Sequence, residues 1–108
     1  MVVDSTAINQ EIEHYIAEVG KTVNIDKAYL SGSYASGTQH KYSDVDICFF
    51  SSDFEGQRSV DVLTALLKLT LGYKIDIEPK AFPTSELEAD NPFVKKVIRT
   101  GREIPIPR

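Results

Sequence analysis

Patterns typical of helices and of strands alternate along the whole chain, and this alternation limits the folds that the chain can adopt. The expected order is helix 7–20, strand 27–31, strand 44–51, helix 57–71, strand 75–78, helix 92–100 and an extended tail over 102–108. We expect Pro79 to weaken or end the third strand, because proline cannot donate a hydrogen bond within a sheet. An α/β or α+β fold follows, in which helices pack on a small mixed sheet of three to four strands.

Length and composition favour one intracellular domain. The 108 residues, of which 42% are hydrophobic, fit a single domain over 1–108 that needs no disulfide to hold its core. The single cysteine, Cys48, is expected to be a small buried hydrophobe. Neither a secretion signal nor a membrane-spanning segment is evident, and the net charge of -4 argues against bulk binding of nucleic acid. We therefore expect a cytoplasmic protein that does not bind membranes.

A serine-glycine turn follows the first predicted strand. Gly32 lets the backbone approach an oxyanion closely, and the Ser33 hydroxyl adds a hydrogen-bond donor, so the turn suits phosphate. Such a turn is also common without any ligand. The turn alone therefore leaves both readings open.

Carboxylates occur at strand positions that packing does not require. Asp44 and Asp46 lie two residues apart, so their side chains leave the same face at about 6.6 Å spacing along the strand and can bind a pair of divalent ions. A sheet with one solvated face would explain the same pattern. Asp76, with Glu78 on the same face, offers a third carboxylate if its strand lies alongside. Three carboxylates suit Mg²⁺, which shares its ligand shell with phosphates, so a nucleotide is the expected ligand.

The spacing of these motifs is similar to that of a known superfamily. The run GSYASGTQHKYSDVDICFF, from Gly32-Ser33 to Asp44-x-Asp46 and beyond, resembles the signature of the DNA polymerase beta-like nucleotidyltransferases. The short chain, the IDIE strand and the NPFVKKVIRTGREI ending are similar to the minimal nucleotidyltransferase branch, the MNT domains. The resemblance implies the nucleotidyltransferase fold.

The resemblance also implies a role for each motif residue. Gly32 and Ser33 would hold the β- and γ-phosphates of a nucleoside triphosphate. Asp44 and Asp46 would ligate two Mg²⁺ ions. Asp76 would ligate the catalytic ion and help deprotonate the attacking hydroxyl. The spacing by itself does not decide between Asp76 and Glu78 as the third carboxylate, and family position favours Asp76.

Activity and partner follow from the same resemblance. The partner of an MNT protein is typically a HEPN-domain ribonuclease toxin, which implies an antitoxin that transfers AMP from ATP to a hydroxyl of its partner. Two alternatives stay open: an antitoxin that only occludes its partner, and the catalytic subunit of a small-molecule, aminoglycoside-type nucleotidyltransferase. Many relatives carry arginine where this chain has Ser36, which keeps the occlusion alternative in play. The sequence sets neither the nucleotide preference nor the oligomeric state, and it is compatible with homo- or hetero-oligomers.

Overall fold

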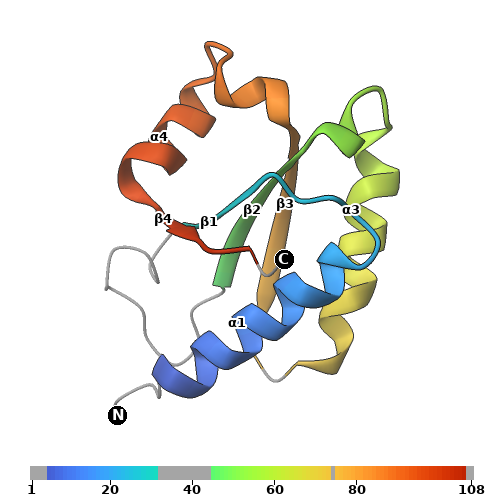
Figure 1. The fold of residues 1–108 in the computed structure, drawn as a ribbon, viewed down its shortest axis with the longest axis vertical. Coiled ribbons are helices and arrows are strands. Elements are labelled where there is room, and N and C mark those ends of the chain that lie inside the picture. The colour runs from blue at the N-terminus through green and yellow to red at the C-terminus, as the bar shows by residue number, and fades with distance from the viewer. Residues whose placement is uncertain (1–4, 32–44, 74, 107–108) are drawn as a thin grey trace.

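A computed structural model describes residues 5–31, 45–73 and 75–106 of the chain. Its elements are α1 (Ser5–Gly20), β1 (Lys27–Ser31), β2 (Val45–Ser51), η1 (Ser52–Phe54), α3 (Ser59–Lys68), η2 (Leu69–Gly72), β3 (Ile77–Pro83), η3 (Thr84–Leu87), α4 (Pro92–Thr100) and β4 (Arg102–Ile104), where η marks short 3₁₀ helices. The strands form one four-stranded sheet in the order β3-β2-β1-β4 (Figure 1). The predicted α/β fold is thereby confirmed.

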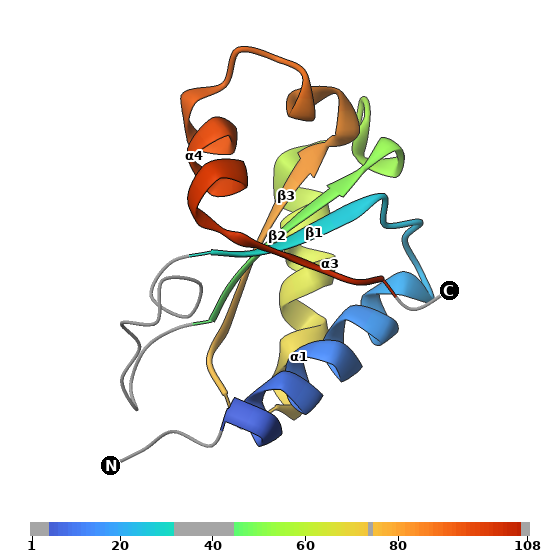
Figure 2. The same cartoon turned by 60° about the vertical axis from the view of Figure 1, so that its left-hand side comes forward.

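The sheet is mixed, because β2 runs parallel to β3 while β1 is antiparallel to both β2 and β4. A parallel pair needs a crossover connection, and α3 provides it between β2 and β3. The helices α1 and α3 cover one face of the sheet and α4 covers the other (Figure 2). None of the helices in the described ranges is long and apolar enough to cross a bilayer.

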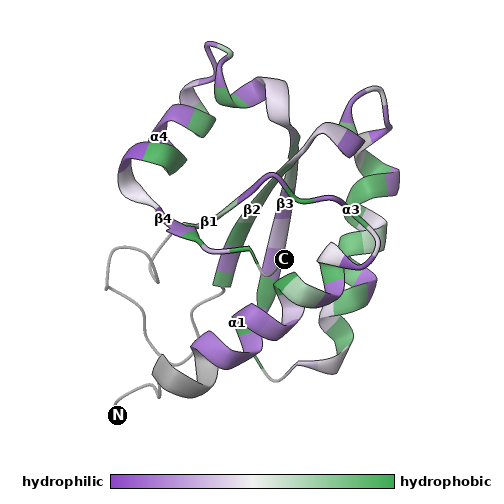
Figure 3. Cartoon of the chain, in the orientation of Figure 1, coloured by the Kyte–Doolittle hydropathy of each residue, from purple (hydrophilic) through white to green (hydrophobic). Residues whose placement is uncertain are grey.

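Two hydrophobic clusters occupy the two faces of the sheet. The larger lies under α1 and α3 and includes Ile16, Leu66 and Phe49. The smaller lies under α4 and includes Phe50 and Val97. In Figure 3, α4 alternates between hydrophobic and hydrophilic colour, as expected for a helix with one buried face. Neighbouring β2 residues thus point into different cores, which explains why this strand is apolar at nearly every position.

The last helix confirms its predicted ends. The Asn91 side chain accepts hydrogen bonds from the backbone N–H groups of Phe93 (3.0 Å) and Val94 (3.3 Å). This cap satisfies donors that have no partner within the helix. Pro92 occupies the first helical position, and Gly101 follows the last. The capping residue, the proline and the glycine in the sequence were therefore sufficient to predict both ends of α4.

One prediction about the strands was wrong. The third strand does not end at Pro79 but runs to Pro83, because β3 is an edge strand. The Asp76 carbonyl accepts from the Val45 N–H (2.7 Å) on β2, and backbone groups alternate in direction, so the nitrogen of Pro79 faces the open edge. The start of the tail is extended, as predicted, and its first three residues form β4, which pairs with β1 and buries Ile104.

Candidate functional site

The predicted site residues fall only in part within the described chain. Asp46 and Asp76 are described, whereas Gly32, Ser33 and Asp44 lie outside the described residues. Their sequence neighbours are informative, because Ser31 precedes Gly32 and is the register partner of Asp46. The chain therefore leaves β1 and re-enters the sheet at β2 at adjacent positions. The turn predicted for phosphate connects two neighbouring strands at this end of the sheet.

Asp46 lies near the start of β2, on the sheet face that α4 covers. Its strand neighbours Cys48 and Phe50 pack into the smaller cluster on that face. The Asp46 side chain is 25% exposed, and its Oδ1 lies 3.7 Å from Nζ of Lys80 on β3. Lys80 thus provides a positive charge next to the carboxylate that the sequence predicts as a metal ligand. This lysine was not singled out from the sequence.

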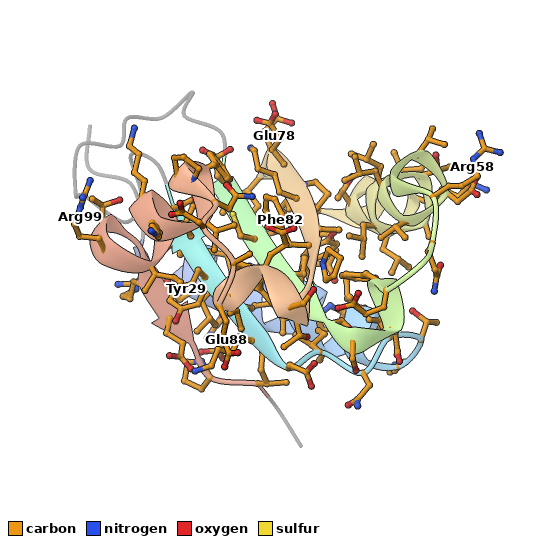
Figure 4. All side chains as sticks on the ribbon, turned by 90° about the horizontal axis from the view of Figure 1, so that it is seen from above. Tyr29, Arg58, Glu78, Phe82, Glu88 and Arg99 are labelled. Atoms are coloured by element: carbon orange, nitrogen blue, oxygen red, sulfur yellow. The ribbon has the colours of Figure 1, made fainter. Side chains whose placement is uncertain are left out.

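Asp76 and Glu78 lie at the start of β3, and both are exposed. Glu78 is the register partner of Asp46 on the neighbouring parallel strand. Figure 4 shows Glu78 projecting outward from β3. Asp76 immediately precedes the strand and meets β2 through its backbone, by the hydrogen bond that its carbonyl accepts from Val45. The structure therefore brings both acids close to the start of β2, and the choice between them stays a prediction.

Oxygen ligands of this kind suit Mg²⁺, which prefers carboxylates and phosphates. Within the ranges 5–31, 45–73 and 75–106, no group of three carboxylate, imidazole or thiol side chains is close enough to hold a metal ion. The predicted cluster needs Asp44 in addition to Asp46 and Asp76. Metal binding by these residues thus depends on a side chain outside the described part of the chain.

A pocket of about 410 Å³ opens between the sheet and α4. Among the described residues, its lining consists of Ser31, Asp46 and Lys80 from the strands and Phe93, Lys96, Val97 and Thr100 from α4. The pocket therefore combines one carboxylate, two ammonium groups, two hydroxyls and one aromatic ring. Sequence reasoning assigned Lys96 no role in the candidate site. The four α4 residues lie at positions i, i+3, i+4 and i+7, and this spacing was the signal that they share a helix face.

Cys48 is a small buried residue of the smaller cluster, as predicted. Its side chain is fully buried, and its Sγ lies 3.8 Å from Oγ of Ser31. Burial raises the pKa of the Cys48 thiol above its ordinary value. The thiol therefore stays protonated near neutral pH and is no nucleophile.

Comparisons with known proteins agree with this geometry. A family model described as a nucleotidyltransferase domain matches residues 12–103. Among solved structures, a protein from Sulfolobus solfataricus assigned as a nucleotidyltransferase is similar with a TM-score of 0.62 at 16% identity, covering 86% of this chain and 73% of its own. A chain from a structure of a toxin-antitoxin with AMP-PNP is similar with a TM-score of 0.58 at 21% identity, covering 89% of this chain and 74% of its own. No curated protein matches the sequence. At these identities the two structures show a shared fold.

Proposed function

The chain belongs to the nucleotidyltransferase domain family, and from that premise we propose that it transfers AMP from ATP to a hydroxyl group of a partner protein. The observation that carries the proposal is the family match over residues 12–103, which includes β1, β2 and β3 together with both predicted motifs. The pocket beside Asp46 supports it, because Ser31, which directly precedes the Gly32-Ser33 motif in the sequence, also lines that pocket.

We assign the roles as the motifs suggest. Gly32 and Ser33 bind the β- and γ-phosphates through backbone and hydroxyl donors. Asp44, Asp46 and Asp76 hold two Mg²⁺ ions, which when bound supply charge stabilisation to the attacking and leaving oxygens. The acceptor hydroxyl oxygen bonds to the α-phosphorus as the bond to pyrophosphate breaks. The proton of that hydroxyl passes to Asp76.

The partner in this proposal is a toxin. The fold shared with a chain of a toxin-antitoxin structure that contains AMP-PNP supports an antitoxin role and ATP as the nucleotide. The resemblance to MNT domains points further, to a HEPN-type ribonuclease whose Tyr, Ser or Thr hydroxyl is the acceptor. In this proposal the protein acts in the cytoplasm as a single domain over 1–108.

The test is transfer of label from α-³²P-ATP to the partner in the presence of Mg²⁺. The wild type is expected to label one protein band, and γ-³²P-ATP is expected to label none, because pyrophosphate leaves. Asp44→Asn removes a proposed metal ligand at nearly constant volume and should lower the labelling rate by at least about 100-fold. Chelation of divalent ions should abolish labelling in the wild type.

Asp61→Asn is the matched control for Asp44→Asn. Asp61 is an exposed acid on α3 that pairs with Arg58 at 3.9 Å, away from the α4 face, so its loss should leave transfer unchanged. Equal transfer rates in Asp44→Asn and the wild type would exclude the proposed role of that carboxylate.

A second candidate function, inhibition by occlusion without catalysis, is favoured by one observation. The Lys80 ammonium group lies 3.7 Å from the Asp46 carboxylate, so this one carboxylate has a positive partner without a metal ion. Under this alternative, Asp44→Asn still suppresses the toxicity of the partner in cells. Loss of suppression together with loss of transfer would instead support the enzyme.

A further inference from the structure

The wall of the pocket formed by α4 has a composition that the predicted catalytic motifs do not account for. Phe93, Lys96 and Thr100 come from one face of the helix and line the pocket opposite Asp46. The Thr100 hydroxyl donates to the Lys96 carbonyl (2.7 Å), which orders the last turn of this wall. The helix thus contributes an aromatic ring, a cation and a hydroxyl to the pocket lining.

Phe93 ends a row of aromatic rings that runs from the core to the surface. Phe50 stacks on Phe82 with centroids 5.5 Å apart, and Phe82 contacts Phe93 at 5.7 Å. Phe50 is fully buried, whereas Phe93 remains 42% exposed. Figure 4 shows Phe82 between the sheet and the α4 side of the molecule. The outermost ring is thus held from behind and keeps accessible surface on which a planar group can stack.

The charges of the pocket favour an anion. Among the described residues that line the pocket, Lys80 and Lys96 carry positive charges and Asp46 carries a negative one. Lys80 is shared with Asp46 at 3.7 Å. Lys96 makes no ion pair within the described parts of the chain, so its ammonium group can bind a ligand without breaking an existing pair.

These features together fit a ligand that has a planar ring and several negative charges. A tyrosine side chain of an acceptor protein would use the ring of Phe93 but would leave the excess positive charge unmatched. A nucleoside triphosphate uses both. Ser31 lines the pocket and directly precedes Gly32, so a ligand seated there can extend its phosphates toward the predicted phosphate turn.

We infer that this pocket is the nucleotide-binding site of the protein, in which the base stacks on Phe93 and Lys96 binds the phosphate chain. The inference rests on the proposed function and adds to it that α4 supplies residues that bind the base and the phosphates. Because Phe93 and Lys96 belong to α4 rather than to the catalytic motifs, their contribution is to binding. They are binding residues whose effect should appear in affinity before any chemistry occurs.

The test is equilibrium binding of two probes to the full chain, measured by isothermal titration calorimetry with Mg²⁺. The first probe is α,β-methylene-ATP, which cannot transfer AMP, and the second is inorganic tripolyphosphate, which has no base. Phe93→Leu removes the ring but stays apolar, and should weaken α,β-methylene-ATP about tenfold while leaving tripolyphosphate unchanged. Lys96→Gln should weaken both probes by about tenfold.

Matched controls come from the same helix. Lys95 is an exposed lysine next to Lys96 that pairs with Asp90, and Ile98 is 39% exposed; neither lines the pocket. Lys95→Gln and Ile98→Ala should therefore bind both probes as the wild type does. Melting temperatures of all four variants, measured by circular dichroism, verify that each is folded.

The outcomes separate this inference from the proposed function. The inference is wrong if the wild type does not bind α,β-methylene-ATP. It is also wrong if Phe93→Leu and Lys96→Gln bind this probe with the same affinity as the controls. Either result overturns the inference even if label transfer occurs. If binding depends on Phe93 and Lys96 but the protein transfers no label, the result supports the nucleotide-binding pocket and contradicts the proposed transferase activity. In that case the protein is a nucleotide-binding module.

Discussion

Tyr15 shows how a single polar group is accommodated in the larger core. Its side chain is fully buried, and its hydroxyl donates to the backbone carbonyl of Leu66 at 2.9 Å. The ring makes edge contacts with Phe49 and Tyr73 at centroid distances of 5.8 and 5.7 Å. Burial, and to a lesser extent the nearby Tyr73, raises the pKa of Tyr15 well above its ordinary value. The hydroxyl therefore remains a neutral donor that links α1 to α3.

Tyr15→Phe should lower the free energy of unfolding by about 1 to 2 kcal/mol, because the Leu66 carbonyl loses its buried donor. The measurement is urea unfolding followed by circular dichroism. Tyr29→Phe is the control, since the Tyr29 hydroxyl reaches Glu103 at only 3.5 Å near the sheet edge. Its removal should cost less than about 0.5 kcal/mol. Equal losses in the two variants would contradict the role given to the buried hydrogen bond.

The residues of the candidate site differ in how visible they are in the sequence. Asp44 and Asp46 stand out because acids interrupt an otherwise apolar strand, and such positions need a reason. Phe93 and Lys96 do not stand out, because an aromatic and a lysine on an amphipathic helix are ordinary surface residues. Their relation to Asp46 comes only from the packing of α4 across the sheet. Lys80 could not be assigned to the site from the sequence, because its strand was expected to end at Pro79.

Among the elements, the junction of α4 and β4 is the most tightly constrained. A Cβ atom on Gly101 would lie 2.5 Å from the Val97 carbonyl oxygen and 2.8 Å from that of Leu30. Both contacts are to backbone, which cannot rotate out of the way. Glycine is therefore required here by close approach, and it lets the chain pass from α4 directly into a strand beside β1.

Gly101→Ala should lower the free energy of unfolding by about 2 to 3 kcal/mol, because α4 and β1 must separate to admit the methyl group. Gly20→Ala is the matched control: Gly20 ends α1, and a Cβ there meets no atom within 4 Å. That variant should be as stable as the wild type or slightly more stable. Urea unfolding of the three proteins is the measurement, and a Gly101→Ala variant with wild-type stability would refute the close contact.

Elements with local signals were predictable, and those that depend on distant pairing were not. The ends of α4 follow from Asn91, Pro92 and Gly101. The true length of β3 depends on its place at the sheet edge, where the nitrogen of Pro79 needs no partner. The β4 strand forms because β1 has a free edge to pair with. The sequence of residues 102–104 does not indicate that such an edge is available. Sheet order is a tertiary property that short sequence patterns do not contain.

At the scale of the whole molecule, one sheet separates two cores of unequal size. Tyr15, Ile16 and Phe49 are among the larger side chains of the α1 and α3 side, while the α4 side is built from fewer residues around Phe50. Alternate residues of β2 belong to different cores, so neither core can form without that strand. This shared strand is the physical basis for our proposal that residues 1–108 are one domain, with the pocket held between the smaller core and α4.

The two cores should therefore unfold together, and Cys48 reports on the smaller one. Its buried thiol should react with a brief pulse of a disulfide reagent only in unfolded molecules, because burial both covers the sulfur and raises the pKa of the thiol. The folded state thus holds the thiol proton more tightly, so stability is lost as pH rises past the unfolded thiol pKa of about 8.5. Pulses at a pH of about 7.5 avoid this loss.

In a urea series, the labelling midpoint of Cys48 should coincide with the midpoint of helical circular dichroism, which α1 and α3 dominate. An earlier labelling midpoint would mean that the α4 side opens on its own and that the chain is not one cooperative unit.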